Sequence, residues 1–295
     1  MLHLHTQPTM GQCVALRGRA GSDAPEALLD ANTQEVLAFL AERPVHTVVM
    51  TSFINDNGLV SDLNRGKFFG YRNAIGQLEG VALIGHTTLV EARSDAALEA
   101  LAYAASFAET PIHLVMSSSD AAARFWSLAS NGAKPRLTCV EKLFEAAFPF
   151  PARRDEGLRK AVLNELIPVA EAQAEVAFAE SGVDPMLRDR EGFLCRVARR
   201  IEQGRVFVKF DGDELVFKAD IIAETDETAY LEGVYTAPKY RGQGIGPRCL
   251  STITVELLSR VANVCLLSNV TFETAHRSFE RAGYRNTAEC RTLFV

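Results

Sequence analysis

Residues 231–250 read LEGVYTAPKYRGQGIGPRCL and hold the most informative pattern of the chain. An apolar strand pattern runs to Thr236, a turn follows at Ala237-Pro238, and glycines occupy positions 242, 244 and 246 just before a helical pattern. Glycine permits backbone angles and close approaches that a side chain would block. Successive N–H groups can therefore converge on a phosphate, toward which the positive end of the helix dipole also points. With the charge of Arg241 beside it, this segment predicts a diphosphate site.

Other glycine motifs fit the segment less well. A dinucleotide-binding loop has the spacing GxGxxG and opens a parallel βαβ unit, whereas here the third glycine comes one residue earlier and the preceding strands have the pattern of an antiparallel meander. An ATP-binding loop needs Gly-Lys-Ser/Thr, and no lysine follows Gly246. A glycine-rich turn that holds no ligand stays open as the plain alternative.

The sequence around the loop predicts alternating helices and strands. Ahead of it we expect a helix at 158–180 that is interrupted at Pro168, a helix at 189–203, and a hairpin at 205–224 that turns at Asp211-Gly212-Asp213. After it we expect a helix at 247–260, a strand at 264–267, a helix at 271–281 and a strand at 284–295. His276 in the last of these helices is predicted to face solvent.

The first half of the chain has a similar order. It predicts a helix at 32–43, an apolar β-branched segment at 45–53 that is typical of a strand, strands at 68–73, 78–84 and 112–116, helices at 95–108 and up to 128, and an extended segment at 137–148. IHLVMSSSDAAARFWSLASNGAK and VCLLSNVTFETAHRSFERAGYR both run from an apolar strand into a helix with a phenylalanine and then a glycine. We interpret this as an internal duplication. Pro149-Phe-Pro151 and the charges after it form the candidate linker.

Length, charge and cysteines set broad limits. A chain of 295 residues favours two domains, and a net charge of -6 argues against nucleic-acid binding, which needs a basic surface. The six cysteines form no CxxC pair, no apolar run is long enough for a membrane span, and the N-terminus does not have the pattern of a signal peptide. We therefore expect a cytoplasmic protein without a membrane or nucleic-acid partner. His3 and His5 could chelate a metal ion, but a frayed terminus explains them better, so we expect no metal.

The segment APKYRGQGIG has Arg-x-x-Gly-x-Gly after a strand and a proline, and it resembles the acetyl-CoA signature of the GNAT N-acetyltransferases. HRSFERAGYR at 276–285 resembles the later helix of that family, which usually ends in Gly-Phe or Gly-Tyr. The resemblance covers roughly the C-terminal half, and the first half looks like a second, diverged unit, as in tandem GNAT proteins. It implies an α+β fold with two GNAT-like domains in tandem, at residues 1–150 and 151–295. Each would have a mixed, mostly antiparallel central sheet flanked by helices.

This resemblance implies acetyl-CoA as the cosubstrate. The pantetheine arm would pair with the strand backbone at 234–236, where an N–H group would polarise the thioester carbonyl, and Glu232 would be the general base, unless it is only a solvated or ion-paired strand carboxylate. Asn269 would hydrogen-bond the pantetheine or merely close a turn, and Phe279 stands where the family commonly has a tyrosine that protonates the thiolate. The candidate cofactor-binding residues are Val234, Tyr235, Thr236, Arg241, Gly242, Gln243, Gly244, Ile245, Gly246, Asn269 and Phe279.

Two functions stay open at this point. One is an enzyme that acetylates a small-molecule amine or a protein amino group. The other is a non-catalytic acyl-CoA-binding sensor or scaffold, which Phe279 favours because it replaces the tyrosine that is common in the family. The first half also speaks for it, because bulky and acidic residues, Leu89, Val90 and Glu91, stand there at the place of the glycine loop. We expect that half to give structural support or one wall of the acceptor site. The sequence gives no indication of the oligomeric state.

Overall fold

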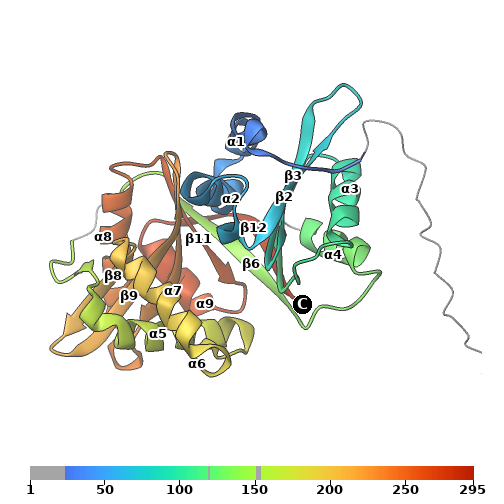
Figure 1. Ribbon diagram of the computed structural model, residues 1–295. Coiled ribbons are helices and arrows are strands. Elements are labelled where there is room, and N and C mark those ends of the chain that lie inside the picture. Colours follow the sequence, from blue (N-terminus) through green and yellow to red (C-terminus); the bar gives the residue numbers. More distant parts are fainter. Residues whose placement is uncertain (1–23, 119, 151–153) are drawn as a thin grey trace, which may run out of the picture.

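The computed structural model describes residues 24–118, 120–150 and 154–295 (Figure 1). The first half contains the short 3-10 helices η1 (Asp30–Asn32) and η2 (Asp62–Asn64) and the helices α1 (Thr33–Ala41), α2 (Pro44–Asn57), α3 (Asp95–Ala105) and α4 (Ala121–Ala129). Its strands are β1 (Glu26–Ala27), β2 (Gly66–Arg72), β3 (Leu78–Gly85), β4 (Thr87–Ala92), β5 (Leu114–Ser118) and β6 (Leu137–Ala146). The predicted metal pair His3 and His5 and residues 151–153 of the predicted linker lie outside the described residues.

The second half repeats much of this order. Its helices are η3 (Leu163–Glu165), α5 (Leu166–Ser181), α6 (Pro185–Arg188), α7 (Arg190–Glu202), η4 (Pro238–Tyr240), α8 (Ile245–Leu257) and α9 (Glu273–Arg281). Its strands are β7 (Arg159–Lys160), β8 (Val206–Asp211), β9 (Glu214–Glu224), β10 (Thr228–Thr236), β11 (Asn263–Asn269) and β12 (Arg285–Phe294). The predicted hairpin is confirmed, since β8 and β9 pair around Gly212, whose φ of +58° suits a tight turn.

One twelve-stranded sheet runs through both halves in the order β1-β2-β3-β4-β5-β12-β6-β11-β10-β9-β8-β7. The pairings β4–β5 and β10–β11 are parallel, and the others are antiparallel. The predicted fold class is therefore confirmed: a mixed, mostly antiparallel sheet with flanking helices.

The two halves exchange strands at the centre of this sheet. Strand β6 comes from the first half but lies between β11 and β12, and β12 from the end of the chain pairs with β5 of the first half. Phe144 of β6 is accordingly buried in the core of the second half. The boundary at residue 150 stays a prediction, because β6 and β12 each join the two halves.

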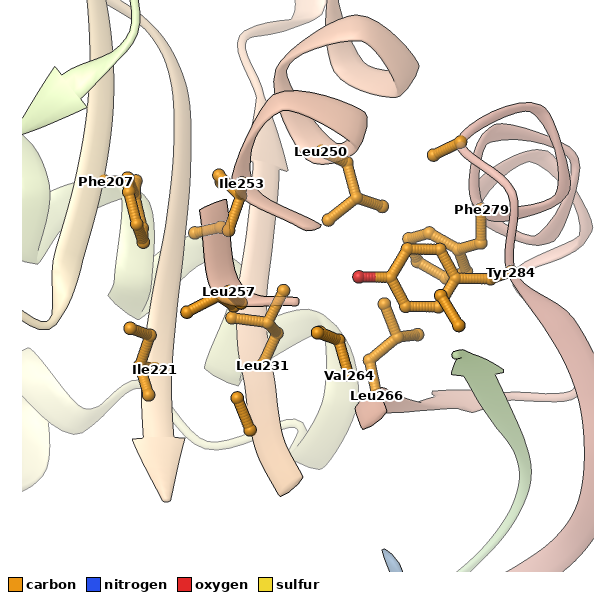
Figure 2. Close-up of a cluster of buried hydrophobic side chains, with 14 of the residues drawn as sticks. Phe207, Ile221, Leu231, Leu250, Ile253, Leu257, Val264, Leu266, Phe279 and Tyr284 are labelled. Atoms are coloured by element: carbon orange, nitrogen blue, oxygen red, sulfur yellow. The ribbon is translucent and has the colours of Figure 1, made fainter. Parts of the chain in front are cut away.

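Helices cover both faces of the sheet. In the second half α8 and α9 pack on one face, where Phe207, Leu231 and Leu266 lie with Leu250 and Phe279 in a hydrophobic core (Figure 2). On the other face of this half lie α5 and α7. In the first half α3 and α4 cover one face and α1 and α2 the other. Helix α2 also contacts β9 and β10, so it bridges the two halves.

The structure corrects three predictions. Residues 45–53, expected as a strand, belong to α2, because Pro44 occupies the first turn of a new helix, where its missing N–H costs nothing. Leu89, Val90 and Glu91 lie inside β4 and not in a loop after the central strand. Pro168 does not interrupt a helix, since α5 begins at Leu166 and the proline falls in its first turn. Within the described residues no helix has the length and apolarity that a membrane crossing requires.

Candidate functional site

Strands β10 and β11 run side by side only at their start. Residues 228–231 of β10 pair with residues 263–266 of β11, and no pairing follows although both strands continue. The last residues of β11 pair instead with β6 on their other side, where Asn269 stands opposite Glu141. The ends of β10 and β11 that do not pair with each other therefore diverge, and we call the space between them the wedge. It lies where β10 leads into the glycine loop.

A β-bulge in β10 accompanies this divergence. The register with β9 shifts between Glu232, which faces Asp220, and Tyr235, which faces Lys218. Gly233 supplies the left-handed φ of +59° at the bulge, and a Cβ there would collide with polar side-chain atoms of Gln173 and Lys218. Because a bulge bends its strand, it turns this end of β10 away from β11.

The bulge leaves backbone groups of β10 facing the wedge. The N–H of Ala237 donates to the carbonyl of Val216 in β9 at 2.9 Å. Since N–H groups alternate in direction along a regular antiparallel strand, that of Thr236 points to the opposite edge. This edge can accept an extended ligand as an additional strand.

The glycine loop places a row of amides at the start of α8. Gly242 and Gly244 have φ values of +76° and +75°, and Gly244 is the N-cap without any side-chain cap. Among the described residues no acceptor is found for the N–H groups of residues 242–246. A Cβ on Gly246 would come within 3.0 Å of the Thr236 hydroxyl, so the glycine lets α8 approach β10 closely. The loop has the unpaired donors and positive dipole end that the sequence predicted for an anion site.

The other side chains of the loop have separate roles. Arg241 is exposed, donates from Nε to the carbonyl of Thr236 at 2.8 Å, and lies 3.7 Å from the carboxylate of Glu175. Gln243 donates to the carbonyl of Lys239 at 2.9 Å, which ties the loop back on itself. Ile245 packs against the hydrophobic core below α8. Arg241 is thus held beside the amides and keeps its charge accessible.

Glu232 lies in the wedge on the face of the sheet that carries α5 and α7. The Tyr230 hydroxyl donates to its Oε1 at 2.7 Å. Burial raises the pKa of Glu232, although the hydrogen bond from Tyr230 and the charge of Arg200 act in the opposite direction. A carboxyl group whose pKa is raised toward neutrality has the property that a general base needs.

Asn269 and Phe279 have structural contacts of their own. The Asn269 side-chain oxygen accepts from the backbone N–H and the hydroxyl of Thr271 at 3.0 and 2.8 Å, which closes a turn at the end of β11. Phe279 is buried in the core (Figure 2), and its ring lies 5.4 Å from that of Phe144. Tyr284 lies in the same core and its hydroxyl bonds to that of Thr254 on α8 at 2.7 Å. Neither aromatic side chain is placed to give a proton to a ligand in the wedge.

His276 is buried and not solvated as predicted, since its ring contacts Phe144 and its Nε2 lies 3.0 Å from the carbonyl of Asn269. Sequence reasoning also missed Glu141 and Glu180, which the structure brings near Glu232. Burial and the neighbouring carboxylates raise the pKa of Glu180 to about 8, and burial raises that of Glu141 to about 7. No local motif marks them. Only the exchange of β6 between the halves, which the sequence does not reveal, brings Glu141 to the wedge.

The first half has no equivalent loop. Only Arg93 and Ser94 separate β4 from α3, and the Ser94 hydroxyl caps that helix by accepting the N–H of Ala97. Glu91 near the end of β4 is buried and ion-paired with Arg43 at 2.9 Å and Arg93 at 3.4 Å. The helix start is closed by its own side chain, so it offers no cradle for an anion.

Comparisons with known proteins agree with this geometry. Residues 202–286 match the family model of the acetyltransferase (GNAT) domain, and no curated protein sequence matches the chain. Among solved structures, a Drosophila protein superimposes with a TM-score of 0.65 at 13% identity, covering 92% of this chain and 99% of that one. A GNAT-family acetyltransferase from Colwellia psychrerythraea covers the same shares with a TM-score of 0.56 at 14% identity.

A third structure has the tandem arrangement. It is a tandem GNAT protein from the clavulanic acid biosynthesis pathway, with a TM-score of 0.56 at 12% identity, and the match covers 92% of this chain and 97% of that one. At such identities the likeness concerns the fold. Residues 202–286 in the second half therefore match a GNAT acetyltransferase domain, and the chain as a whole has the fold of a tandem GNAT protein.

Proposed function

We propose that this protein transfers the acetyl group of acetyl-CoA to an amine of a small molecule or a protein. One observation carries the proposal: the unpaired amides of residues 242–246, the open edge of β10 and the carboxyl group of Glu232 follow one another along a single wedge. Each of these features fits a different part of the reaction.

The residues present fit coenzyme A. The amides of the loop and the guanidinium of Arg241 would hold the pyrophosphate, and the backbone of 234–236 would pair with the amide-bearing pantetheine arm. The close approach of α8 to β10 at Gly246 keeps the loop and the strand edge adjacent. When bound, acetyl-CoA supplies an acyl carbon that is activated as a thioester.

The residues of the chain would then handle one proton and one developing charge. As the acceptor nitrogen bonds to the acyl carbon, its proton passes to Glu232, directly or through water, and the bond from carbon to sulfur breaks. A backbone N–H in the segment 234–236 would stabilise the negative charge on the carbonyl oxygen. The sulfur leaves as a thiolate, which is a stable anion compared with an alkoxide. The lack of a proton donor at Phe279 therefore slows this step without preventing it.

The test is release of free thiol from acetyl-CoA with a panel of amines, amino acids and peptides. We expect turnover with at least one class, and a loss of about 100-fold in kcat for Glu232→Gln with coenzyme A affinity unchanged, since the variant keeps the shape but loses the base. Absence of turnover with every acceptor, together with tight coenzyme A binding, would instead support a non-catalytic acyl-CoA sensor or scaffold. The observation that favours this second function is the core position of Phe279, where the family commonly has its acid.

We also propose a cytoplasmic location with no nucleic-acid or membrane partner. The net charge of -6 supports the absence of a nucleic-acid partner. Cys139, Cys195, Cys249, Cys265 and Cys290 are all free thiols, which suits a reducing compartment.

A further inference from the structure

Three carboxyl groups from distant parts of the chain lie around the wedge, and burial together with the charge of Glu232 raises the pKa of both Glu180 and Glu141. Glu232 belongs to β10, Glu180 lies near the end of α5, and Glu141 belongs to β6, opposite Asn269. The Sγ of Cys139, two residues before Glu141, lies 3.7 Å from the carbonyl of Glu180, which joins the end of α5 to β6. Glu141 is thus brought to the second half by a strand of the first half.

Only part of this acidic surface is neutralised by the protein. Lys218 and Arg200 both face the buried Asp220, at 2.7 and 3.7 Å, and Arg136 donates to the carbonyl of Ser181 beside Glu180 at 2.9 Å. Lys218 is further engaged by Gln173 at 2.5 Å and by the carbonyl of Gly233 at 3.3 Å. Two of these three cations are directed at Asp220, and none forms an ion pair with Glu232, Glu141 or Glu180 among the described residues.

The hydrogen bonds of the three glutamates leave acceptors free. Glu232 receives one bond from Tyr230, and Glu141 receives one from Thr292 of β12 at 2.5 Å. No ion pair is found for Glu180 or Glu141 among the described residues, and part of the Glu180 residue reaches solvent. Asp220, directly opposite Glu232, is fully buried and is met by Lys218 at 2.7 Å, so that lysine is already engaged.

The spacing of these groups distinguishes between kinds of cation. Nowhere in the described part of the chain do three acidic, histidine or cysteine side chains converge closely enough to hold one metal ion. The charges are instead spread over β6, α5 and β10. Such a surface suits an elongated organic cation whose positive groups are separated by a chain, because each group can then meet its own carboxylate.

We propose that Glu141, together with Glu180, binds a second ammonium group of the acceptor while Glu232 receives the amine that reacts, so that the acceptor is a diamine or a longer polyamine. This inference rests on the proposed function for the identity of the reacting end. It gives the first half a defined part in recognition, because β6 delivers Glu141. A protein lysine with a second basic residue nearby presents the same chemistry only if it reaches into the wedge, and a free diamine is the simpler probe.

The experiment measures binding by calorimetry with the full chain saturated with coenzyme A. The probes are 1,4-diaminobutane and 1-aminobutane, which differ in one ammonium group. We expect the wild type to bind the diamine at least 10-fold more tightly, and Glu141→Gln to lose at least 10-fold for the diamine with little change for the monoamine. Glu145→Gln is the matched control: Glu145 lies four residues further along β6 and also accepts from a β12 threonine, Thr287. It should bind both probes as the wild type does.

Several results would overturn the inference. These are equal affinity of the wild type for the two amines, no binding of either, or an equal loss for both in Glu141→Gln. Thermal unfolding of the variants shows whether any loss reflects misfolding, and Glu180→Gln then serves as a second, more exposed substitution with the same expectation. Because binding is read without acetyl transfer, Glu141-dependent diamine binding without turnover would refute the enzyme and keep the recognition site. Turnover of monoamines as efficient as that of diamines would keep the enzyme and refute the inference.

Discussion

The two halves of the molecule carry the same strand and helix at equivalent places and connect them differently. In the second half, residues 237–244 lie between β10 and α8, and the helix starts with uncapped amides. In the first half only residues 93 and 94 lie between β4 and α3, and Ser94 caps the helix. The packing of a helix on the sheet is therefore kept in both halves, while an uncapped row of amides at the helix start is found in one. The connection that carries these amides is six residues longer than its counterpart.

Glu91 and Glu232 extend the comparison to the strands. Each lies just past the point where its strand loses its parallel neighbour, β5 for β4 and β11 for β10. Glu91 is closed off by two arginines, whereas Glu232 is held by one tyrosine hydroxyl in the open wedge. The same residue type is a structural ion pair in one half and a candidate base in the other.

The largest expected effect comes from a substitution that tests whether the two halves unfold as one unit. Phe144→Ala removes a first-half side chain from the second-half core, and we expect a loss of about 4 kcal/mol in the free energy of unfolding. Urea unfolding should show a single transition shifted for the entire chain, because β6 and β12 join both halves. Phe148→Ala, at an exposed side chain, should cost less than about 0.5 kcal/mol. Two separate transitions, with only one of them shifted, would show independent halves.

Gly244→Glu should reduce coenzyme A affinity at least 100-fold, about 3 kcal/mol, by placing a negative side chain at the phosphate cradle. Gly76→Glu is its counterpart in the first half. Both glycines have open space and a left-handed φ, +75° and +83°, so each substitution costs about 1–2 kcal/mol of stability. Calorimetry should then find the affinity lost only in the Gly244 variant. Equal affinities in the two variants would place the cradle elsewhere.

Glu91→Gln should lower stability by about 2 kcal/mol and leave the rate of acetyl transfer within about twofold of the wild type. Arg43 and Arg93 would lose their buried partner, and their partial exposure limits the cost because water can replace it. Denaturant unfolding and the thiol-release assay, run on the same samples, separate this effect from that of Glu232→Gln. A rate loss in both variants would mean that the first half takes part in the chemistry.

The sequence predicted the local geometry of the glycine loop and missed the long-range contacts around Glu232. The loop from Gly242 to Gly246 could be predicted because a row of free main-chain amides requires glycines just before a helix. That pattern lies in adjacent residues of the sequence. Residues 45–53 were misread because a β-branched apolar run suits a strand and a buried helix equally well, and only the role of Pro44 decides. Glu141 could not be found, since its place depends on a strand exchange between residues more than a hundred positions apart.

The pH dependence of stability gives the smallest effect and connects the two halves most directly. The pKa of Glu141 is raised to about 7 from 4.5, so the folded state holds a proton that the unfolded chain releases. Its contribution to stability is complete below about pH 4.5 and is lost as the pH rises through about 7. Glu141→Gln carries no such group, so the wild type should lose about 1–2 kcal/mol relative to the variant between these pH values, a figure reduced from the full shift for partial exposure.

The Glu141→Gln substitution also changes the pKa of a neighbouring carboxyl group. Removing the Glu141 charge also lowers the pKa of Glu180, while the pKa of Glu232 is raised by burial and by the charge of Asp220 and lowered by the charges of Arg200 and Lys218. Urea unfolding of the two proteins at steps from pH 4.5 to 8 measures the difference, and Glu145→Gln should follow the wild type. Parallel curves for wild type and Glu141→Gln would show that Glu141 is solvated. A variant that grows relatively more stable toward neutral pH would mean that the folded chain tolerates this carboxylate at a cost, as expected where a side chain is kept to meet a cation from outside.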